Sequence, residues 1–336
     1  MNYKFNRFLA KVPCVGENHY NELSQIIDKK MESTTLTCSE KERLQYELKV
    51  IKETGSAKLF LFVFNALKNF SVGECCFFGK ENNCFINYLL GFTSVNPVKY
   101  KLQFELFFNP ERAYYPVFCF YIKKGTRERL LNSICDCYKI TRLIKGNDNV
   151  CRYFIDIDDK MNIKQEKNDC ERTSYAETTA EISAAELSKR GLFEFDVLEY
   201  EDNKIVAKEF SDEEVFNEAI RTVAYKPAIL SLKPFEKIDE IKEILNRTEG
   251  KLIFQEQVVE ILNKVCGLDP VESDCIRKSI CTKEQDYNKE VATILHNKFG
   301  TDGDEFFDYL RSNGLYTVSE GYVIARMKND VVWEKE

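Results

Sequence analysis

The hydrophobic pattern of the chain changes at Ser211, and this change restricts the folds that the chain can adopt. Before that point, short apolar runs typical of strands alternate with helical segments, whereas the pattern beyond it is helical. Ser211 with Glu214 predicts a capping box, and Asp269–Pro270 predicts a second helix start. We therefore expect an α/β domain over residues 1–209 and a helical domain over residues 210–336.

The first domain is expected to contain a sheet flanked by helices. The run PVFCFYI, which starts at Pro116, is apolar on both faces and therefore predicts a central strand. A break near Gly55 divides an otherwise helical stretch. In chain order we expect two helices within 39–70, strands over 101–108 and 116–122, a basic helix over 126–138, strands over 153–157 and 191–200, and an exposed polar excursion over 159–179.

Composition and charge exclude several classes of protein. Hydrophobic residues make up 44% and charged residues 31%, without low-complexity tracts, so extensive disorder is not expected. The net charge of −7 argues against a protein that coats DNA through a generally basic surface. The longest apolar stretch, 59–67, is too short to cross a bilayer, and the amino-terminal residues do not resemble a signal peptide. We expect a cytoplasmic protein with no membrane partner.

The thirteen cysteines are scattered along the chain, which predicts free thiols in a reducing compartment. Cys75–Cys76 and the Cys135/Cys137 pair lack the spacing of zinc fingers. The two histidines, His19 and His296, lie far from either pair, so no zinc site is expected.

Four separated blocks of the chain carry specific motifs. They are LQYELKVIKETGSAKLFLFVFNAL from Leu44, NYLLGFTSVNPVKYKLQFELFFNPER from Asn87, GLFEFDVL from Gly191, and LIFQEQVVEILNKVCGLDPVESDCIRK from Leu252. In this order they resemble the bacterial C-family DNA polymerases, the DNA polymerase III alpha subunits. The second block is the most specific, because Gly91, Thr93, Pro97 and Tyr100 and the run Asn109–Arg112 recur at family spacing. In the fourth block the motif QEQV and Arg277 match, and Lys278 replaces a second arginine.

The resemblance implies a specific α/β fold. Residues 1–209 would form a palm of the DNA polymerase beta-like nucleotidyltransferase type, a mixed sheet with helices. Residues 210–336 would form an all-helical fingers domain, and the thumb is largely absent.

The same resemblance indicates that the catalytic site is degraded. The family holds two Mg²⁺ ions with carboxylates at alternate positions of one strand and a further aspartate on a neighbouring strand. Here Val117, Cys119 and Tyr121 occupy the alternate positions, and Asp196 is the only family aspartate that remains. One carboxylate does not organise two metal ions, so we expect neither a cofactor nor a metal, with Asp196 as the ligand if any metal binds.

Two regions resemble the family's phosphate-binding sites. Gly79 remains from a glycine-rich loop, and Lys80 beside it could meet a phosphate. In the fingers, Arg277 and Lys278 correspond to the arginine pair that grips the triphosphate. The alternative is that Gln255, Glu256 and Arg277 pack and bond the helices of the fingers. Further along, Lys123, Lys124, Arg127 and Arg129 predict either a DNA-binding patch or a solvated helix face.

These features predict a DNA polymerase III alpha-like protein without catalysis that binds nucleic acid or a replication partner. An alternative is an active DNA polymerase with a rebuilt metal site, in which Asp156 and Asp158 join Asp196 and hold Mg²⁺. The plainer interpretation of Asp156 and Asp158 is a solvent-facing strand end. A second alternative is a module that binds only other proteins.

Overall fold

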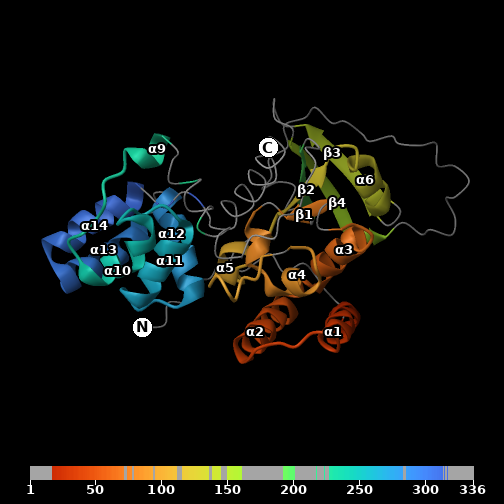
Figure 1. The fold of residues 1–336 in the computed structure, drawn as a ribbon, viewed down its shortest axis with the longest axis horizontal. Helices are drawn as coiled ribbons and strands as arrows, with labels where there is room; N and C mark the ends of the chain where they lie inside the picture. Colours follow the sequence, from red (N-terminus) through yellow and green to blue (C-terminus); the bar gives the residue numbers. More distant parts are fainter. Residues whose placement is uncertain are drawn as a thin grey trace, which may run out of the picture. The chain divides into compact units, whose positions relative to one another are not determined.

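The computed structural model describes residues 17–71, 74–77, 79–93, 95–111, 116–135, 138–144, 150–160, 192–200, 217, 223, 227–282, 285–312, 314 and 316. The chain divides into two compact units (Figure 1). The first consists of Met1–Lys101 and Arg112–Asp202, and the second of Leu102–Glu111 and Asn203–Glu336. The segment Leu102–Glu111 therefore belongs to the second unit, although both of its flanks belong to the first.

A five-stranded mixed sheet forms the centre of the first unit, in the order β1-β2-β5-β4-β3. Strand β2 pairs with β1 in antiparallel and with β5 in parallel orientation. Strands β4 and β5, and β3 and β4, pair antiparallel. The strands are β1 Cys75–Phe77, β2 Phe118–Lys123, β3 Tyr138–Ile144, β4 Val150–Lys160 and β5 Leu192–Tyr200.

Helices flank this sheet, and the two helices expected within 39–70 are confirmed. The first begins after Thr37, whose side chain accepts a hydrogen bond from the Glu40 N–H in a capping box. It ends at Gly55, which has φ 66° and closes the helix in the left-handed conformation. The helices are α1 Glu17–Met31, α2 Cys38–Thr54, α3 Ala57–Leu67, α4 Phe85–Leu89 and α6 Arg127–Cys135, with the 3-10 helix η1 over Lys80–Asn83.

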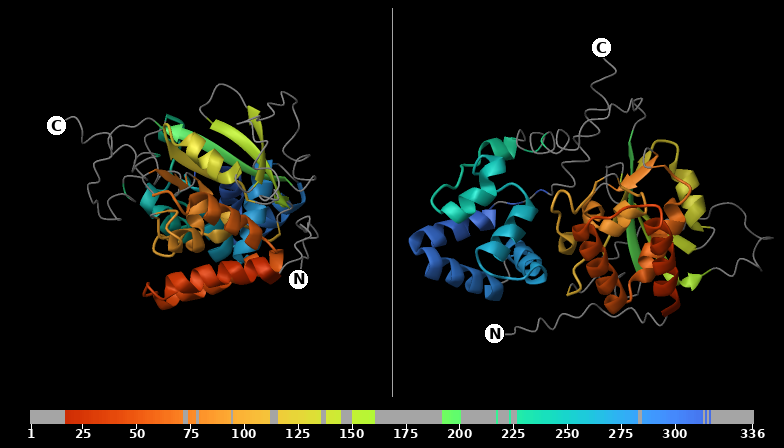
Figure 2. Two further views of the ribbon diagram at one scale, coloured as in Figure 1. Left: turned by 90° about the vertical axis from the view of Figure 1, so that its right-hand side faces the viewer. Right: turned by 60° about the horizontal axis from the view of Figure 1, so that its bottom comes forward.

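The hydrophobic core of the first unit lies on one face of β2. Phe118 and Phe120 are 0% exposed, and the ring of Phe60 from α3 meets Phe118 edge-on at 6.0 Å. Helices α3 and α6 cover this face (Figures 1 and 2). On the other face of β2, Cys119 is only partly buried. Strand β2 is thus an interior strand, as expected, but its second face is not fully covered.

The second unit is helical. Phe306 of α14 packs edge-on against Phe235 at 4.8 Å in the centre of its core. Helices α13 and α14 run side by side (Figure 2). The elements are α5 Phe104–Phe107, α9 Pro227–Leu230, α10 Asp239–Leu245, η2 Asn246–Thr248, α11 Gln255–Lys264, α12 Pro270–Thr282, α13 Gln285–Phe299 and α14 Thr301–Ser312.

Some expectations about elements are wrong. Residues 101–108 do not form a strand, because Phe104–Phe107 is a short helix. All four residues of this helix are buried, so the alternating sequence does not correspond to one buried and one exposed face. The basic helix ends at Cys135, and Tyr138 already begins β3, which the sequence did not predict. The helix start at Asp269 is confirmed, because its carboxylate accepts a hydrogen bond from the Glu272 N–H at 2.9 Å.

Other expectations lie outside the described residues. These are the capping box of Ser211 and Glu214 and nearly all of the excursion over 159–179. The domain boundary at residue 209 also stays a prediction, since 201–216 are not described. The broader expectation of a mixed α/β region followed by helices agrees with the structure.

Two further features concern the apolar character of the helices and the cysteine side chains. Within the described ranges, no helix combines the length and the apolar character needed to span a bilayer. The described cysteines that carry free thiols are Cys38, Cys75, Cys76, Cys84, Cys119, Cys266 and Cys275.

Candidate functional site

The positions that correspond to the family's catalytic carboxylates lie in β2 and directly before it, on the partly open face of the sheet. Val117 and Cys119 are half-buried there, and Tyr121 is buried. Burial, and after it the neighbouring Cys76, raises the pKa of Tyr121 to about 12, so its hydroxyl stays neutral. Mg²⁺ prefers hard oxygen ligands, above all carboxylates. A valine, a thiol and a neutral phenol do not fit a pair of Mg²⁺ ions.

Asp196 lies on the strand next to these positions. In the parallel pairing of β2 and β5, its Cα partner is Cys119. In the antiparallel pairing of β5 and β4, its Cα partner is Arg152. The remaining family aspartate is therefore flanked by a cysteine on one side and an arginine on the other. No second carboxylate occupies either of these two register positions.

Asp156 and Asp158 lie on β4, but not at the level of Asp196. The Cα partner of Asp156 is Leu192, four residues before Asp196 on β5. At the rise of a strand this offset is about 13 Å, and Asp158 lies still further along β4. The ions of a two-metal site are only about 4 Å apart. The backbone register thus gives no single level at which the three aspartates meet.

Glu81 lies in the loop that was expected to bind phosphate, and its carboxylate is directed into the protein. Glu81 is only 2% exposed to solvent. The Oε2 atom accepts a hydrogen bond from the Gly79 N–H at 2.9 Å, and the Oε1 atom accepts one from the Cys119 N–H of β2. Desolvation raises the pKa of Glu81 to about 7. A buried carboxyl group therefore takes up two backbone donors, one from the loop and one from β2.

This arrangement also defines the surroundings of Gly79 and Lys80. A Cβ atom on Gly79 would lie 3.0 Å from Oε2 of Glu81, so the glycine permits the close approach of that carboxylate. Lys80 is partly exposed at the first position of η1. The Gly79 N–H is engaged within the chain, which weakens the comparison with an open phosphate loop.

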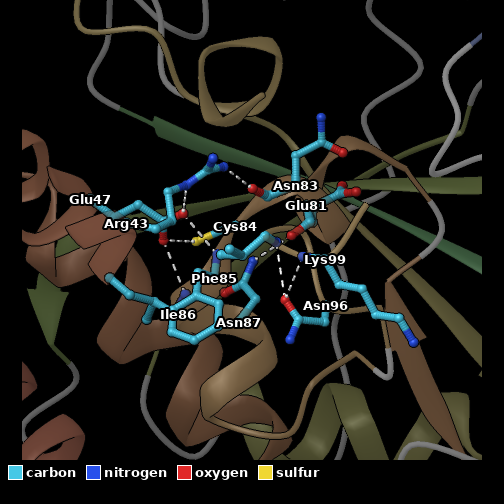
Figure 3. Close-up of polar contacts among 11 residues, drawn as sticks. Arg43, Glu47, Glu81, Asn83, Cys84, Phe85, Ile86, Asn87, Asn96 and Lys99 are labelled. Atoms are coloured by element: carbon cyan, nitrogen blue, oxygen red, sulfur yellow. Dashed lines mark hydrogen bonds and ion pairs between the residues drawn. The ribbon is translucent and has the colours of Figure 1, made fainter. Parts of the chain in front are cut away.

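Polar contacts hold the rest of the loop. The Asn82 side chain donates to the Gly79 carbonyl at 2.8 Å, and the Thr93 hydroxyl donates to the Asn82 side chain. The Asn87 side chain donates to the carbonyl of Glu81 at 2.9 Å (Figure 3). Because each of these residues is buried, the contacts fix the loop as an internal part of the fold.

A second buried carboxylate, that of Glu47, anchors the end of the loop (Figure 3). It accepts hydrogen bonds from the backbone N–H groups of Phe85 at 2.8 Å and Ile86 at 3.0 Å, at the start of α4. Unlike Glu81, it has a cationic partner: Arg43 lies 2.7 Å away and also donates to the Asn83 carbonyl. Glu47 therefore joins α2 to the loop and to α4.

In the second unit, Arg277 forms a buried ion pair. Its Nη2 atom lies 3.0 Å from Oδ1 of Asp274, and the two side chains are 8% and 0% exposed. The Asn109 side chain donates to the other oxygen of Asp274 at 3.1 Å and to the Val271 carbonyl at 3.0 Å. Arg277 thus compensates the buried charge of Asp274, and Asp274 in turn attaches Asn109 to α12. Lys278 follows on the same helix and is partly exposed.

The QEQV motif also has an internal role. The Gln257 side chain accepts the Phe254 N–H at 3.0 Å and donates to the Thr248 hydroxyl at 2.7 Å. Gln257 therefore joins the start of α11 to the preceding turn. These contacts agree with the interpretation that the matched fingers residues support packing.

The four predicted DNA-binding cations lie in one stretch at the end of β2 and the start of α6. Lys123 and Arg127 are partly exposed, and Lys124 and Arg129 are exposed. Arg129 lies 2.6 Å from Glu74 and over the ring of Phe70 at 4.3 Å. Its positive charge is thus partly compensated.

Among the side chains that the structure describes, no three His, Cys, Asp or Glu residues form a group that could hold a metal ion. The side chains of Asp156, Asp158 and Asp196 lie outside this description.

Known families account for most of the chain. The family model described as the bacterial DNA polymerase III alpha NTPase domain matches residues 17–224, and the model of the finger domain of the same subunit matches residues 217–301. The chain belongs to the bacterial DNA polymerase III alpha family. Together the two matches extend from α1 to the start of α14.

Curated DNA polymerase III alpha subunits are similar over a shorter stretch. One from Staphylococcus aureus is 33% identical over 100 residues, and one from Staphylococcus epidermidis is 32% identical over 99 residues. Each match covers 29% of this chain and 9% of the relative. This chain therefore corresponds to a small part of the length of those polymerase subunits.

Three residues that organise the candidate site were not predicted from the sequence of this polymerase III alpha family member. They are Glu81, Glu47 and Asp274. The only signal for Glu81 is one acidic residue between two apolar runs. Its partner Cys119 lies 38 residues away in sequence, so no local pattern reveals the contact. Asp274 lies within the fourth matching block, but the sequence does not reveal its pairing with Arg277.

Proposed function

We propose that this protein is a DNA polymerase III alpha homologue that has lost nucleotidyl transfer and retains a role in binding nucleic acid. The main support is the strand beside Asp196, where Cys119 occupies the partner position and no carboxylate is present on β2. Without several converging carboxylates, two Mg²⁺ ions are not held and the attacking hydroxyl is not activated. The proposal includes action in the cytoplasm and no required cofactor.

The sheet order supports a palm of the DNA polymerase beta-like type as part of this proposal. In such a palm, the strand with two carboxylates lies next to the strand with the third. Here β2 and β5 are neighbours with Cys119 opposite Asp196. The ancestral arrangement of strands then remains, while the chemistry of one strand has changed.

The loop and the fingers support the loss of nucleotide binding. The Gly79 N–H donates to Glu81, which puts a carboxyl group of the protein where an anionic ligand would need a donor. Arg277 is paired with the buried Asp274. Freeing its guanidinium for a triphosphate would leave a buried carboxylate without its cation, which is costly.

Primer extension tests the catalytic part of the proposal. The full chain should incorporate no nucleotide into a primed template with Mg²⁺ or Mn²⁺, and Asp196→Ala should behave identically. Incorporation by the wild type that disappears in Asp196→Ala would overturn the proposal. Loss of incorporation also in Asp156→Ala and Asp158→Ala would support the rebuilt metal site instead.

A titration with primed DNA at two salt concentrations tests the binding part. Contacts to phosphates release counterions, so binding should weaken steeply as salt rises. Replacing Lys123 and Lys124 by alanine should weaken binding at low salt. The matched control replaces Lys29 and Lys30, two exposed lysines of α1, and should bind as the wild type does. Absence of any salt-sensitive binding would instead favour a protein-interaction module, such as one that binds a replication partner.

A further inference from the structure

The Glu81 carboxyl group differs from that of Glu47, the other buried carboxylate described in its unit, in how its charge is compensated. Within the described residues, no lysine, arginine or histidine forms an ion pair with it, whereas Glu47 has Arg43 at 2.7 Å. Its hydrogen-bond donors are the backbone N–H groups of Gly79, of Cys119 and of Glu81 itself, together with the Cys119 thiol. A charge in this place is stabilised by neutral donors alone.

Two of these donors belong to different elements, so the carboxyl group connects the loop before η1 to β2. The ladder between β1 and β2 ends at the pair Phe77 and Phe120. The next residue of β2, Cys119, donates its N–H to Oε1 of Glu81. Glu81 therefore connects the η1 loop to β2 at the position whose partner on β5 is Asp196.

We propose that the Glu81 carboxyl group is a proton-dependent link between the η1 loop and β2: the closed link holds a proton that the opened form releases. Burial without a cation disfavours the charged form while the link is closed. Once the carboxyl group reaches water, it ionises at its ordinary pKa. Opening therefore becomes easier as pH rises.

The surroundings of Glu81 allow both protonation states. When the carboxyl group is neutral, one oxygen still accepts hydrogen bonds and the other carries an O–H donor. The sulfur of Cys119, which already contacts Glu81, can accept from this O–H. Among the described side chains, the titratable groups near the loop are Lys80 in η1, the Cys119 and Cys84 thiols and the Arg43–Glu47 pair. On β5, Asp196 occupies the register position opposite Cys119. Burial raises the pKa of the Cys84 thiol well above its ordinary value of 9.0, so this thiol does not titrate in the same range.

Residue-resolved amide exchange on the full chain tests the link. In the wild type, the protection of the Gly79 and Cys119 amides, corrected for intrinsic exchange, should fall by about tenfold or more between about pH 5 and about pH 7. In Glu81→Gln, which cannot ionise, their protection should not change over this range. The amides of Phe85 and Ile86, which donate to Glu47, are internal controls and should not follow the wild-type change.

A second measurement keeps the proposal testable if Glu81→Gln does not fold. Carbon-13 NMR of the wild type reports the titration of the Glu81 carboxyl group itself, which should have a midpoint near the pKa of about 7, where the loss of amide protection levels off. Equal pH dependence in the wild type and Glu81→Gln would overturn the proposal. So would a carboxyl titration that is complete before the amides lose protection.

Discussion

At the scale of single residues, three buried carboxylates differ in how their charge is compensated. Glu47 has Arg43, Asp274 has Arg277 and Asn109, and Glu81 has neutral donors alone. Compensation by a nearby cation favours the charged form, whereas burial without one disfavours it. The three residues should therefore respond differently to pH and to substitution.

The unfolding free energy should depend on pH through Glu81. Its pKa is raised from 4.5 to about 7 in the folded protein, so the folded state binds the extra proton. This contribution is fully present below about pH 4.5 and is lost as pH rises through about 7, a difference of roughly 3 kcal/mol. Urea unfolding at a series of pH values measures it as the difference between the wild type and Glu81→Gln.

Glu74 supplies a control of opposite sign. A backbone hydrogen bond from Ser71, and with it Arg129, lowers its pKa to about 2. Its contribution is present above about pH 4.5 and is lost as pH falls toward about 2. Because the side chain is 35% exposed, solvent screens the effect, and Glu74→Gln should change the pH profile only slightly. A pH profile for Glu81→Gln that matches the wild type would contradict the assignment.

Removing one partner of the Asp274–Arg277 pair should be severe. Arg277→Ala leaves a fully buried carboxylate without its cation, and we expect a loss of about 3 kcal/mol or more in the unfolding free energy. Lys264→Ala breaks an exposed pair with Glu260 in the same unit and should cost under about 1 kcal/mol. Urea unfolding of both variants gives the comparison. Similar losses would show that burial does not set the contribution of these pairs.

At the scale of elements, the start of α2 allows a direct test of its cap. Thr37→Ala removes the acceptor of the Glu40 N–H and should lower stability by about 1 kcal/mol. Thr293 is an exposed residue inside α13 whose hydroxyl bonds only the carbonyl of Lys289. Thr293→Ala should be neutral or slightly stabilising, because alanine has the higher helix propensity. Thermal unfolding measures both.

Elements with local signals were predictable, and those defined by distant contacts were not. A cap and Gly55 mark α2, and the run PVFCFYI, which is apolar on both faces, marks β2. Residues 101–108 contain the same residue types as a strand, and only their packing in the second unit selects a short helix. Strand β3 contains basic residues like those of the preceding helix, so its sequence did not distinguish it from that helix. Only the pairing with β4 identifies it as a strand.

The candidate site was predictable to a similar extent. The loss of carboxylates on β2 and the retention of Asp196 followed from the sequence and the resemblance. The partner positions of Asp196, Cys119 and Arg152, required the register of the sheet. The roles of Gly79 and Arg277 in nucleotide binding remain predictions, and both residues have contacts within the chain.

At the scale of the whole molecule, the segment Leu102–Glu111 defines what each unit contains. Asn109 in this segment donates to Asp274 and to the Val271 carbonyl of α12. Asn109→Ala should lower the stability of the second unit by about 1 to 3 kcal/mol, because a buried carboxylate oxygen loses its donor. Amide exchange should show faster opening of α12 while α2 and α3 keep their protection. Equal loss in both units would contradict this assignment.

The membership of Leu102–Glu111 affects how the protein can be divided. The backbone passes from one unit to the other after Lys101, after Glu111 and after Asp202. A fragment that begins at Asn203 lacks the donor to Asp274, and one that ends at Asp202 carries α5 without α12. A single protease cut between residues 202 and 203 would accordingly leave two fragments that stay associated, because Leu102–Glu111 of the first fragment packs in the second unit. Division of the gene at that point would yield two fragments that depend on each other for folding.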